Sequence, residues 1–217
     1  MPTQDYGDIS HNVTPAINSL DQVTDTALSI TFDNDIASGN KGQIQVYNAE
    51  TDEIVDTINP KDEVDIIGYE GQDKHRVVNT SLLSIDGKTL TIRLHNNKLK
   101  YGQSYYVAIG DGVVTGAKLN GIDFVGIGKN SAWQFTTKAT MPTGTHLTVG
   151  PTPDDDFASV QGALNHAMQN LTADTPTTIT IHDGVYHELL FLRNRNNITL
   201  KGKAVTVQLF NSITTKH

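Results

Sequence analysis

Cysteine is absent from the 217-residue chain, tryptophan occurs once, and charged residues make up only 18% of the sequence. Without a thiol, the protein cannot form disulfides, zinc–thiolate sites or a cysteine nucleophile. No apolar run approaches the ~20 residues that a membrane-spanning helix needs. The opening stretch, MPTQDYGDIS, also lacks the basic and apolar regions of a secretory signal peptide. These absences exclude thiol chemistry and leave the cellular compartment open.

Basic residues are too few to balance the acidic ones, and the formal net charge is -8. Most of the acidic excess lies in residues 1–139. Because no basic run interrupts it, this surface is not expected to bind nucleic acid or an anionic membrane. The frequent Thr, Asn and Gly residues are typical of a β protein with many turns.

Short segments of alternating apolar and polar residues, separated by turn sequences, fill residues 27–137. They are ALSITF (27–32), GQIQVY (42–47), TLTIRL (89–94), SYYVAI (104–109) and WQFTT (133–137). Within SYYVAI, the alternation places Tyr105 and Val107 on the same face as Ile109. Tyr106 and Ala108 then share the opposite face. Short strands at this spacing, without a convincing helix, predict a β-sandwich.

Three longer stretches carry a more specific pattern: ITFDNDIASGNKGQIQVYN, LTIRLHNNKLKYGQSYYVAIGDGVV and FVGIGKNSAWQFTTK. In order and spacing they resemble the bacterial Ig-like domain first described in S-layer proteins, over residues 13–138. Trp133 and Phe135 are expected to close the core on the last strand. Such domains usually serve as spacers or accessory modules, so the resemblance implies no catalytic residue in this region.

A linker rich in Thr, Pro and Gly at residues 139–146 precedes a change of pattern. Residues 154–171, DDDFASVQGALNHAMQNL, repeat apolar side chains at intervals of three and four, which predicts an amphipathic helix. The apolar stripe comprises Phe157, Val160, Leu164, Ala167 or Met168, and Leu171. Asp156 is the expected N-cap, and Asp154 and Asp155 complement the helix dipole. After the helix, residues 177–210 return to strand patterns.

Two polar groups in this second segment invite a metal-binding interpretation. Asp154, Asp155 and Asp156 lack the surrounding loop of Asx and Gly ligands of a calcium site, so we expect N-capping and a solvated loop instead. His182 and His187 are five residues apart across a glycine turn, and no carboxylate is spaced to complete a metal site. We expect them to be surface or strand-end histidines.

The segment GVYHE brings Tyr186 and Glu188 together, and Asp183 is the near carboxylate for paired acid–base catalysis. Asp183 lies in a turn, so we expect a structural role. Arg193 and Arg195, in RNRNN, could contact an acidic sugar but are expected to lie on an exposed turn. GDGVVTG and GIGKNS fit no phosphate-loop motif. These residues therefore predict no catalytic, cofactor-binding or metal site.

As a whole, residues 147–202 resemble the opening of the pectin methylesterase family. The match is carried by Phe157, Val160, Gln161, Ala163, Ile181, Gly184, Tyr186, Glu188, Asn197, Ile198, Leu200 and Gly202. The family fold is a right-handed parallel β-helix, with an N-terminal helix that caps its open end. The resemblance implies that the 154–171 helix covers TITI, LLFL and ITL. It implies structural roles for Phe157, Gly184, Tyr186, Glu188, Asn197, Leu200 and Gly202.

In that family one aspartate attacks the methyl ester and a second acts as general acid–base, while glutamines and an arginine assist, without a cofactor. The motifs that carry these residues, of the type GxxDFIFG and LGRPW, do not occur in this sequence. Asp183, Arg193, Arg195 and Gln208 match neither motif. The resemblance therefore implies no catalytic residue in this chain. The last stretch, KAVTVQLFNSITTKH, departs from the family pattern.

Together these patterns predict an all-β chain with an Ig-like sandwich at residues 1–138, a linker at 139–146, and a cap helix with the first rungs of an incomplete parallel β-helix at 147–217. The expected function is that of an N-terminal fragment of a secreted or periplasmic bacterial pectin methylesterase. The fragment is expected to be inactive, and its parent to act on methyl-esterified polygalacturonate. An exposed β-helix edge could pair with other chains. Alternatives are a polysaccharide-binding or adhesion module, a structural spacer, and a pectate lyase on the same fold.

Overall fold

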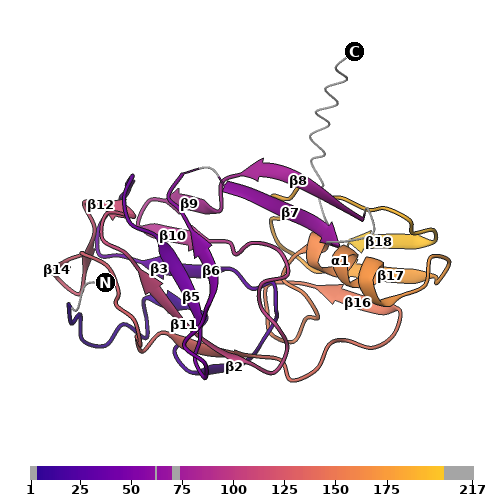
Figure 1. The fold of residues 1–217 in the computed structure, drawn as a ribbon, viewed down its shortest axis with the longest axis horizontal. Coiled ribbons are helices and arrows are strands. Elements are labelled where there is room, and N and C mark those ends of the chain that lie inside the picture. The colour runs from indigo at the N-terminus through magenta and orange to yellow at the C-terminus, as the bar shows by residue number, and fades with distance from the viewer. Residues whose placement is uncertain (1–3, 62, 70–73, 203–217) are drawn as a thin grey trace, which may run out of the picture.

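A two-sheet β-sandwich and a smaller unit of one helix and three strands lie next to each other along the long axis of the molecule (Figure 1). The computed structural model describes residues 4–61, 63–69 and 74–202. The end of the predicted strand pattern, residues 203–210, lies outside the described residues. No helix in the described ranges is long and apolar enough to cross a membrane.

The sandwich has one sheet of four strands and one of five. The first has the order β1 (Val13–Thr14), β3 (Leu28–Thr31), β10 (Thr89–Ile92) and β9 (Leu83–Asp86), all antiparallel. The second has the order β2 (Ser19–Gln22), β15 (Gln134–Thr137), β11 (Ser104–Ile109), β5 (Ile44–Asn48) and β6 (Ile54–Ile58), with β2 parallel to β15. Two short ladders lie beside them, β4 (Ala37–Ser38) with β12 (Val114–Thr115) and β13 (Lys118–Leu119) with β14 (Ile122–Asp123).

The predicted faces of the central strand β11 are confirmed. Its inward face, Tyr105, Val107 and Ile109, joins the main core between the sheets. Its outward face belongs to a separate small cluster with Tyr47. Trp133 is fully buried, as predicted, and its indole Nε1 donates to the carbonyl of Pro15 at 3.0 Å.

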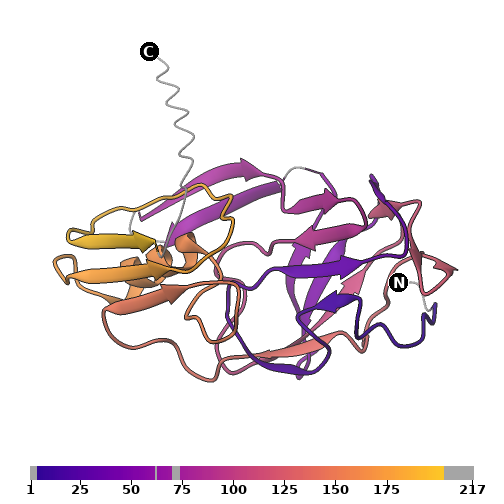
Figure 2. The same ribbon diagram turned by 180° about the vertical axis from the view of Figure 1, so that it is seen from behind.

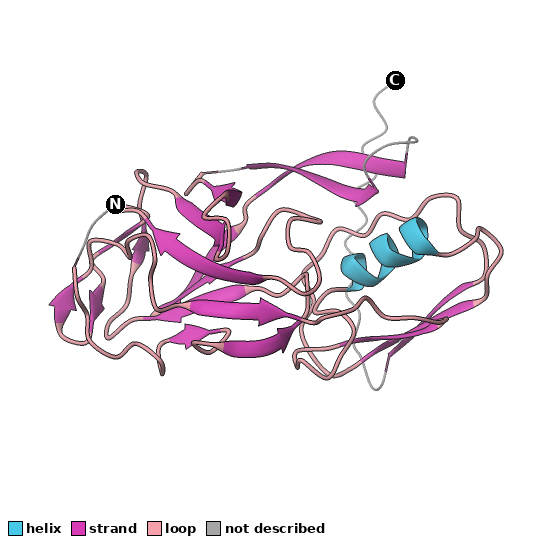
Figure 3. Cartoon of the chain, turned by 60° about the horizontal axis from the view of Figure 1, so that its bottom comes forward, coloured by secondary structure: helices cyan, strands magenta, loops and turns pink. Residues whose placement is uncertain are grey.

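A long hairpin of β7 (Glu63–Tyr69) and β8 (Lys74–Thr80) extends from the sandwich toward the smaller unit. It pairs with neither sheet of the sandwich. Instead, β7 packs against the single helix α1 (Val160–Asn170), as Figure 3 shows. The hairpin therefore connects the two units.

The smaller unit is a parallel sheet in the order β16 (His146–Val149), β17 (Thr177–Ile181) and β18 (Ile198–Gly202). It lies at the opposite end of the molecule from the N-terminus (Figure 2). Helix α1 contacts β16 and β17 on one side and β7 on the other. Because it is covered from two sides, residues 160–168 are all buried, including the polar ones.

The helix is shorter than predicted, and its expected N-cap is wrong. It begins at Val160, and Ser159 is the N-cap residue, accepting from the amide of Gly162 at 2.9 Å. Asp156 does not cap it, because its carboxylate accepts from the amide of Thr148 on β16. This bond holds the preceding chain beside the sheet, where Phe157 forms a bridge with Val149.

The predicted strand at LLFL is also not formed, since residues 189–192 lie outside any strand. The side chain of Gln161 takes the place of a neighbouring strand. Its Oε1 accepts from the amide of Phe191 at 2.7 Å, and its Nε2 donates to the carbonyl of Phe191 at 3.1 Å. One side-chain amide thus satisfies both backbone groups of Phe191, and a full strand ladder is not required.

Candidate functional site

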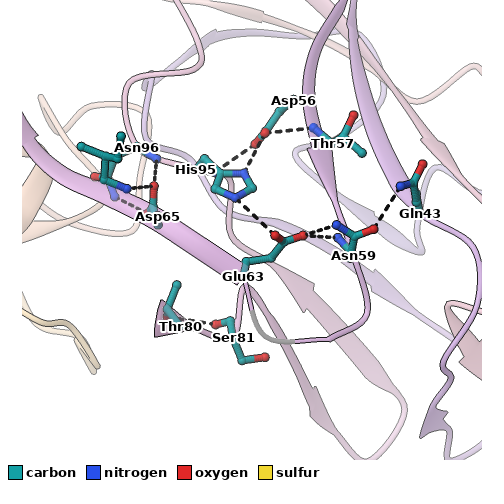
Figure 4. Close-up of polar contacts among 11 residues, drawn as sticks. Gln43, Asp56, Thr57, Asn59, Glu63, Asp65, Thr80, Ser81, His95 and Asn96 are labelled. Atoms are coloured by element: carbon teal, nitrogen blue, oxygen red, sulfur yellow. Dashed lines mark hydrogen bonds and ion pairs between the residues drawn. The ribbon is translucent and has the colours of Figure 1, made fainter. Parts of the chain in front are cut away.

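Residues 93–97, sequence RLHNN, follow β10 and make polar contacts with the sandwich, the hairpin and α1. We call this segment the clasp. Figure 4 shows the contacts of His95 and Asn96 with the sandwich and the hairpin. On the sandwich side, the imidazole Nδ1 of His95 lies 2.8 Å from Oδ1 of Asp56 on β6. The amide of His95 donates to Oδ2 of the same carboxylate at 2.9 Å. Asp56 is buried, and it is held in turn by the amide of Thr57.

On the hairpin side, the next two residues of the clasp hold β7. Asn96 donates to the buried carboxylate of Asp65 twice, from its amide at 3.1 Å and from its side-chain Nδ2 at 2.6 Å. Asn97 donates from Nδ2 to the carbonyl of Gly68 at 3.0 Å. A buried carboxylate needs such donors to offset its lost hydration, so the clasp and β7 stabilise each other.

The clasp also reaches the smaller unit. Oδ1 of Asn96 accepts from Nδ2 of Asn165 on α1 at 3.2 Å. Arg93 donates to the carbonyl of Ser81 at 2.6 Å, and its Nη1 lies 3.5 Å from the carbonyl of His187. Four residues of the clasp therefore contact β6, β7, α1 and the segment before β18.

The imidazole of His95 lies among carboxylates. Its Nε2 is 4.0 Å from Oε2 of Glu63, whose other oxygen is held by the backbone and side-chain amides of Asn59 at 2.6 Å. The hydrogen bond with Asp56 raises the pKa of His95, and the charges of Asp56, Asp65 and Glu63 raise it further, against the opposing effect of burial. An open pocket of about 470 Å³ lies here, lined in part by Lys98.

A second cluster lies at the N-terminus of α1, where two distant carboxylates meet. Asp25, between β2 and β3, accepts from the amides of Ala158 and Ser159 at 2.9 and 2.8 Å and from the Ser159 hydroxyl at 2.6 Å. Glu188 accepts from the amides of Val160 and Gln161 at 3.0 and 2.8 Å. Burial raises the pKa of both carboxyls.

These two acids do what was expected of the local aspartates, since they face the positive end of the helix dipole. Asp155 is instead buried, with Oδ1 2.6 Å from Nδ1 of His182 and Oδ2 3.0 Å from the Thr152 hydroxyl. Its carbonyl accepts from Nζ of Lys138 at 2.6 Å. Asp154 is exposed. Within residues 4–61, 63–69 and 74–202, no three His, Asp or Glu side chains gather as a metal ion would need.

The predicted exposed role of Arg195 is wrong. Its Nε donates to the carbonyl of Ala167 at 2.7 Å and its Nη2 to that of Met168 at 2.6 Å. These carbonyls lie in the last turns of α1, where that of Ala167 also accepts from the amide of Leu171 at 3.2 Å. The planar guanidinium serves both at once, so Arg195 caps the end of the helix.

The remaining motif residues lie around β17 and β18. A Cβ at Gly184 would lie 3.0 Å from the ring of Tyr186, whose hydroxyl donates to the carbonyl of His182. The Asn197 carbonyl accepts from the amide of Thr177 at 3.0 Å. Phe157 is buried, whereas Leu200 on β18 is 46% exposed. Gly202 ends β18, and Asp183 and His187 are exposed.

A family model described as bacterial Ig-like domain matches residues 10–137, more than half of the chain. The chain belongs to the bacterial Ig-like domain family. The matched residues form the sandwich and the β7–β8 hairpin, so the clasp lies inside the Ig-like domain. No curated protein and no solved structure matches the chain.

Sequence reasoning missed the residues that join the sandwich and the clasp to the smaller unit, namely Asp25, Asn96 and Lys138. Asn96 is of a residue type that favours turns, which indicates no particular binding partner. The partners of Asp25, Asn96 and Lys138 lie between 17 and 134 positions away along the chain. No local period or motif marks such pairs.

Proposed function

We propose that this chain is the N-terminal portion of a bacterial pectin methylesterase, in which the Ig-like domain holds the start of a parallel β-helix. In this proposal the parent protein hydrolyses the methyl esters of polygalacturonate outside the cytoplasm. The 217 residues by themselves supply the scaffold and no catalytic group.

The observation that carries the proposal is the register of the parallel sheet. Leu147 of β16 pairs with Ile179 of β17, which pairs with Leu200 of β18. Like residues thus stack on successive strands, as in a solenoid whose rungs bury apolar side chains against one another. Two of these residues, Leu147 and Ile179, lie in the core that α1 covers.

The register supports a parallel β-helix, and the sequence resemblance over residues 147–202 supports the pectin methylesterase family in particular. Several of its residues make specific contacts at the joint between α1 and the sheet. Glu188 binds the first amides of α1, Gln161 binds Phe191, and Tyr186 packs over Gly184. Such contacts give a physical reason for a motif at these positions, independent of catalysis.

The catalytic step requires residues that the sequence does not contain. Neither the GxxDFIFG type nor the LGRPW type of motif occurs among the 217 residues. Purified protein is therefore expected to release no methanol from highly methyl-esterified pectin above a heat-denatured control. A longer product of the same gene, carrying an aspartate motif downstream of His217, is expected to release it. Turnover by the 217-residue protein, or an inactive extended protein with that motif, would overturn the proposal.

The alternative, a polysaccharide-binding or spacer module, is supported by the Ig-like domain alone. Carbohydrate-binding surfaces usually present aromatic rings, but in the described part of the chain the large exposed apolar residues are all aliphatic. Affinity electrophoresis on pectins of different methylation separates the two. Retardation without methanol release from any extended protein favours the binding module.

The parallel sheet ends at β18, which pairs with β17 on one side and with no other described strand. Its unpaired edge and the exposed Leu189 and Leu200 are suited to strand addition by another chain. We propose self-association of the isolated chain through this edge. Sedimentation at increasing concentration tests it, and a strictly monomeric protein would rule it out.

A further inference from the structure

We propose that the clasp is a proton-controlled latch, which holds the β7–β8 hairpin and α1 on the sandwich while His95 carries a proton. The latch concerns the joint between the two units, and it does not depend on the pectin methylesterase assignment.

The covalent adjacency of His95 and Asn96 makes the coupling direct. His95 is anchored to Asp56 of the sandwich through both its backbone amide and its imidazole. Asn96 binds Asp65 of the hairpin (Figure 4), and it also binds Asn165 of α1. A rearrangement at the His95–Asp56 pair therefore moves the residue that contacts both other elements.

The charges around the imidazole favour a cation there. Asp56 on β6 and Glu63 on β7 lie beside it, and the charge of Asp65 acts on it from β7. Lys98 lines the same pocket from the loop that follows the clasp. When His95 loses its proton, the three carboxylates lose the positive charge between them. Repulsion then acts between β6 and β7, the two strands that the clasp joins.

Proton binding is linked to closure of the latch. The folded state raises the pKa of His95, so the closed latch binds the proton more tightly than the open one. The resulting stabilisation is fully present below the ordinary histidine pKa of ~6.5 and is lost as the pH rises through the folded-state pKa. Each unit of pKa elevation corresponds to a change of about tenfold in the opening equilibrium.

Two measurements on the full chain test the latch. Histidine titration by NMR gives the pKa of His95, and hydrogen exchange gives the opening equilibrium of the α1 amides at about pH 5.5 and about pH 9, on either side of the transition. After correction for intrinsic exchange rates, we expect α1 to open more readily at the higher pH. The increase should be about tenfold for each unit by which the measured pKa exceeds ~6.5.

Two variants distinguish the effect of His95 titration from the effect of other titrating groups. His95→Gln keeps a polar side chain without a titrating group, so its α1 protection should lose the pH dependence. His182→Gln removes another histidine that contacts a carboxylate, Asp155, and should retain the wild-type dependence. A wild-type His95 pKa at or below ~6.5 would overturn the proposal, as would α1 protection that does not change with pH. These two wild-type results decide the matter even if His95→Gln fails to fold.

Discussion

Replacing the one glycine of α1 by alanine should destabilise the protein, although the same change stabilises most helices. Alanine is favoured over glycine inside a helix by about 1 kcal/mol. A Cβ at Gly162, however, would lie 2.2 Å from Oδ2 of Asp25 and 2.9 Å from Oγ of Ser159. The carboxylate that reaches α1 from the Ig-like domain occupies the space that a methyl group needs.

The expected magnitude follows from the bonds that Asp25 would lose on moving. It accepts three hydrogen bonds, from the amides of Ala158 and Ser159 and from the Ser159 hydroxyl. Hydrogen bonds to charged groups contribute about 1.5–3 kcal/mol each, and partial access of water reduces their loss to a total on the order of 3 kcal/mol. Against the helix gain, Gly162→Ala should therefore cost about 2 kcal/mol.

A double-mutant cycle makes the cause measurable. In an Asp25→Ala background the obstructing carboxylate is absent, so Gly162→Ala should stabilise α1 by about 1 kcal/mol. The opening free energies of the α1 amides, measured by hydrogen exchange, give all four corners of the cycle. Gln169→Ala, at the exposed end of α1, is the matched control and should change stability by less than about 0.5 kcal/mol. A stabilising Gly162→Ala in the wild-type background would refute the proposed contact between Asp25 and α1.

Two further substitutions test single contacts. Trp133→Phe removes the bond to the Pro15 carbonyl in the core and should lower the free energy of unfolding, measured in urea, by about 2 kcal/mol. An unchanged value would mean that this bond contributes nothing. Arg195→Ala should lower the opening free energy of the last turn of α1, measured by hydrogen exchange, by about 1–2 kcal/mol. The Met168 carbonyl loses the guanidinium donor, and the Ala167 carbonyl keeps only the amide of Leu171. Arg195→Lys should restore part of the lost free energy, since one ammonium cannot reproduce the planar fork.

The sandwich could be predicted from the sequence because each strand carries its own alternation of apolar and polar residues. When apolar and polar residues alternate along a strand, the apolar ones share one face. That face is then expected to be buried. This explains why the two faces of β11 and the burial of Trp133 were predicted. The position of α1 was also predicted from apolar side chains that recur every three or four residues, but its start was placed too early. Asp154, Asp155 and Asp156 precede a helix and have the chemistry of caps, and nothing local shows that two of them are engaged elsewhere.

What covers the polar face of α1 was decided only by the tertiary structure. An amphipathic pattern predicts solvent around the polar residues, yet Gln161, Asn165 and His166 are all buried. Gln161 binds Phe191, Asn165 binds Asn96 of the clasp, and the ring of His166 lies against that of Phe157. Two carboxylates bind the start of the helix. Asp25 precedes α1 in the sequence, and Glu188 follows it.

The sequence by itself determined several strands of the sandwich, the approximate position of the helix, and which faces are apolar. It did so because backbone geometry turns a repeat along the chain into a face in space. The tertiary structure alone decided the partners of the buried polar groups, such as His95 with Asp56 and Asn96 with Asn165. A buried charge or amide requires a partner, but many polar residues of the chain could satisfy it, and only the folded arrangement selects one.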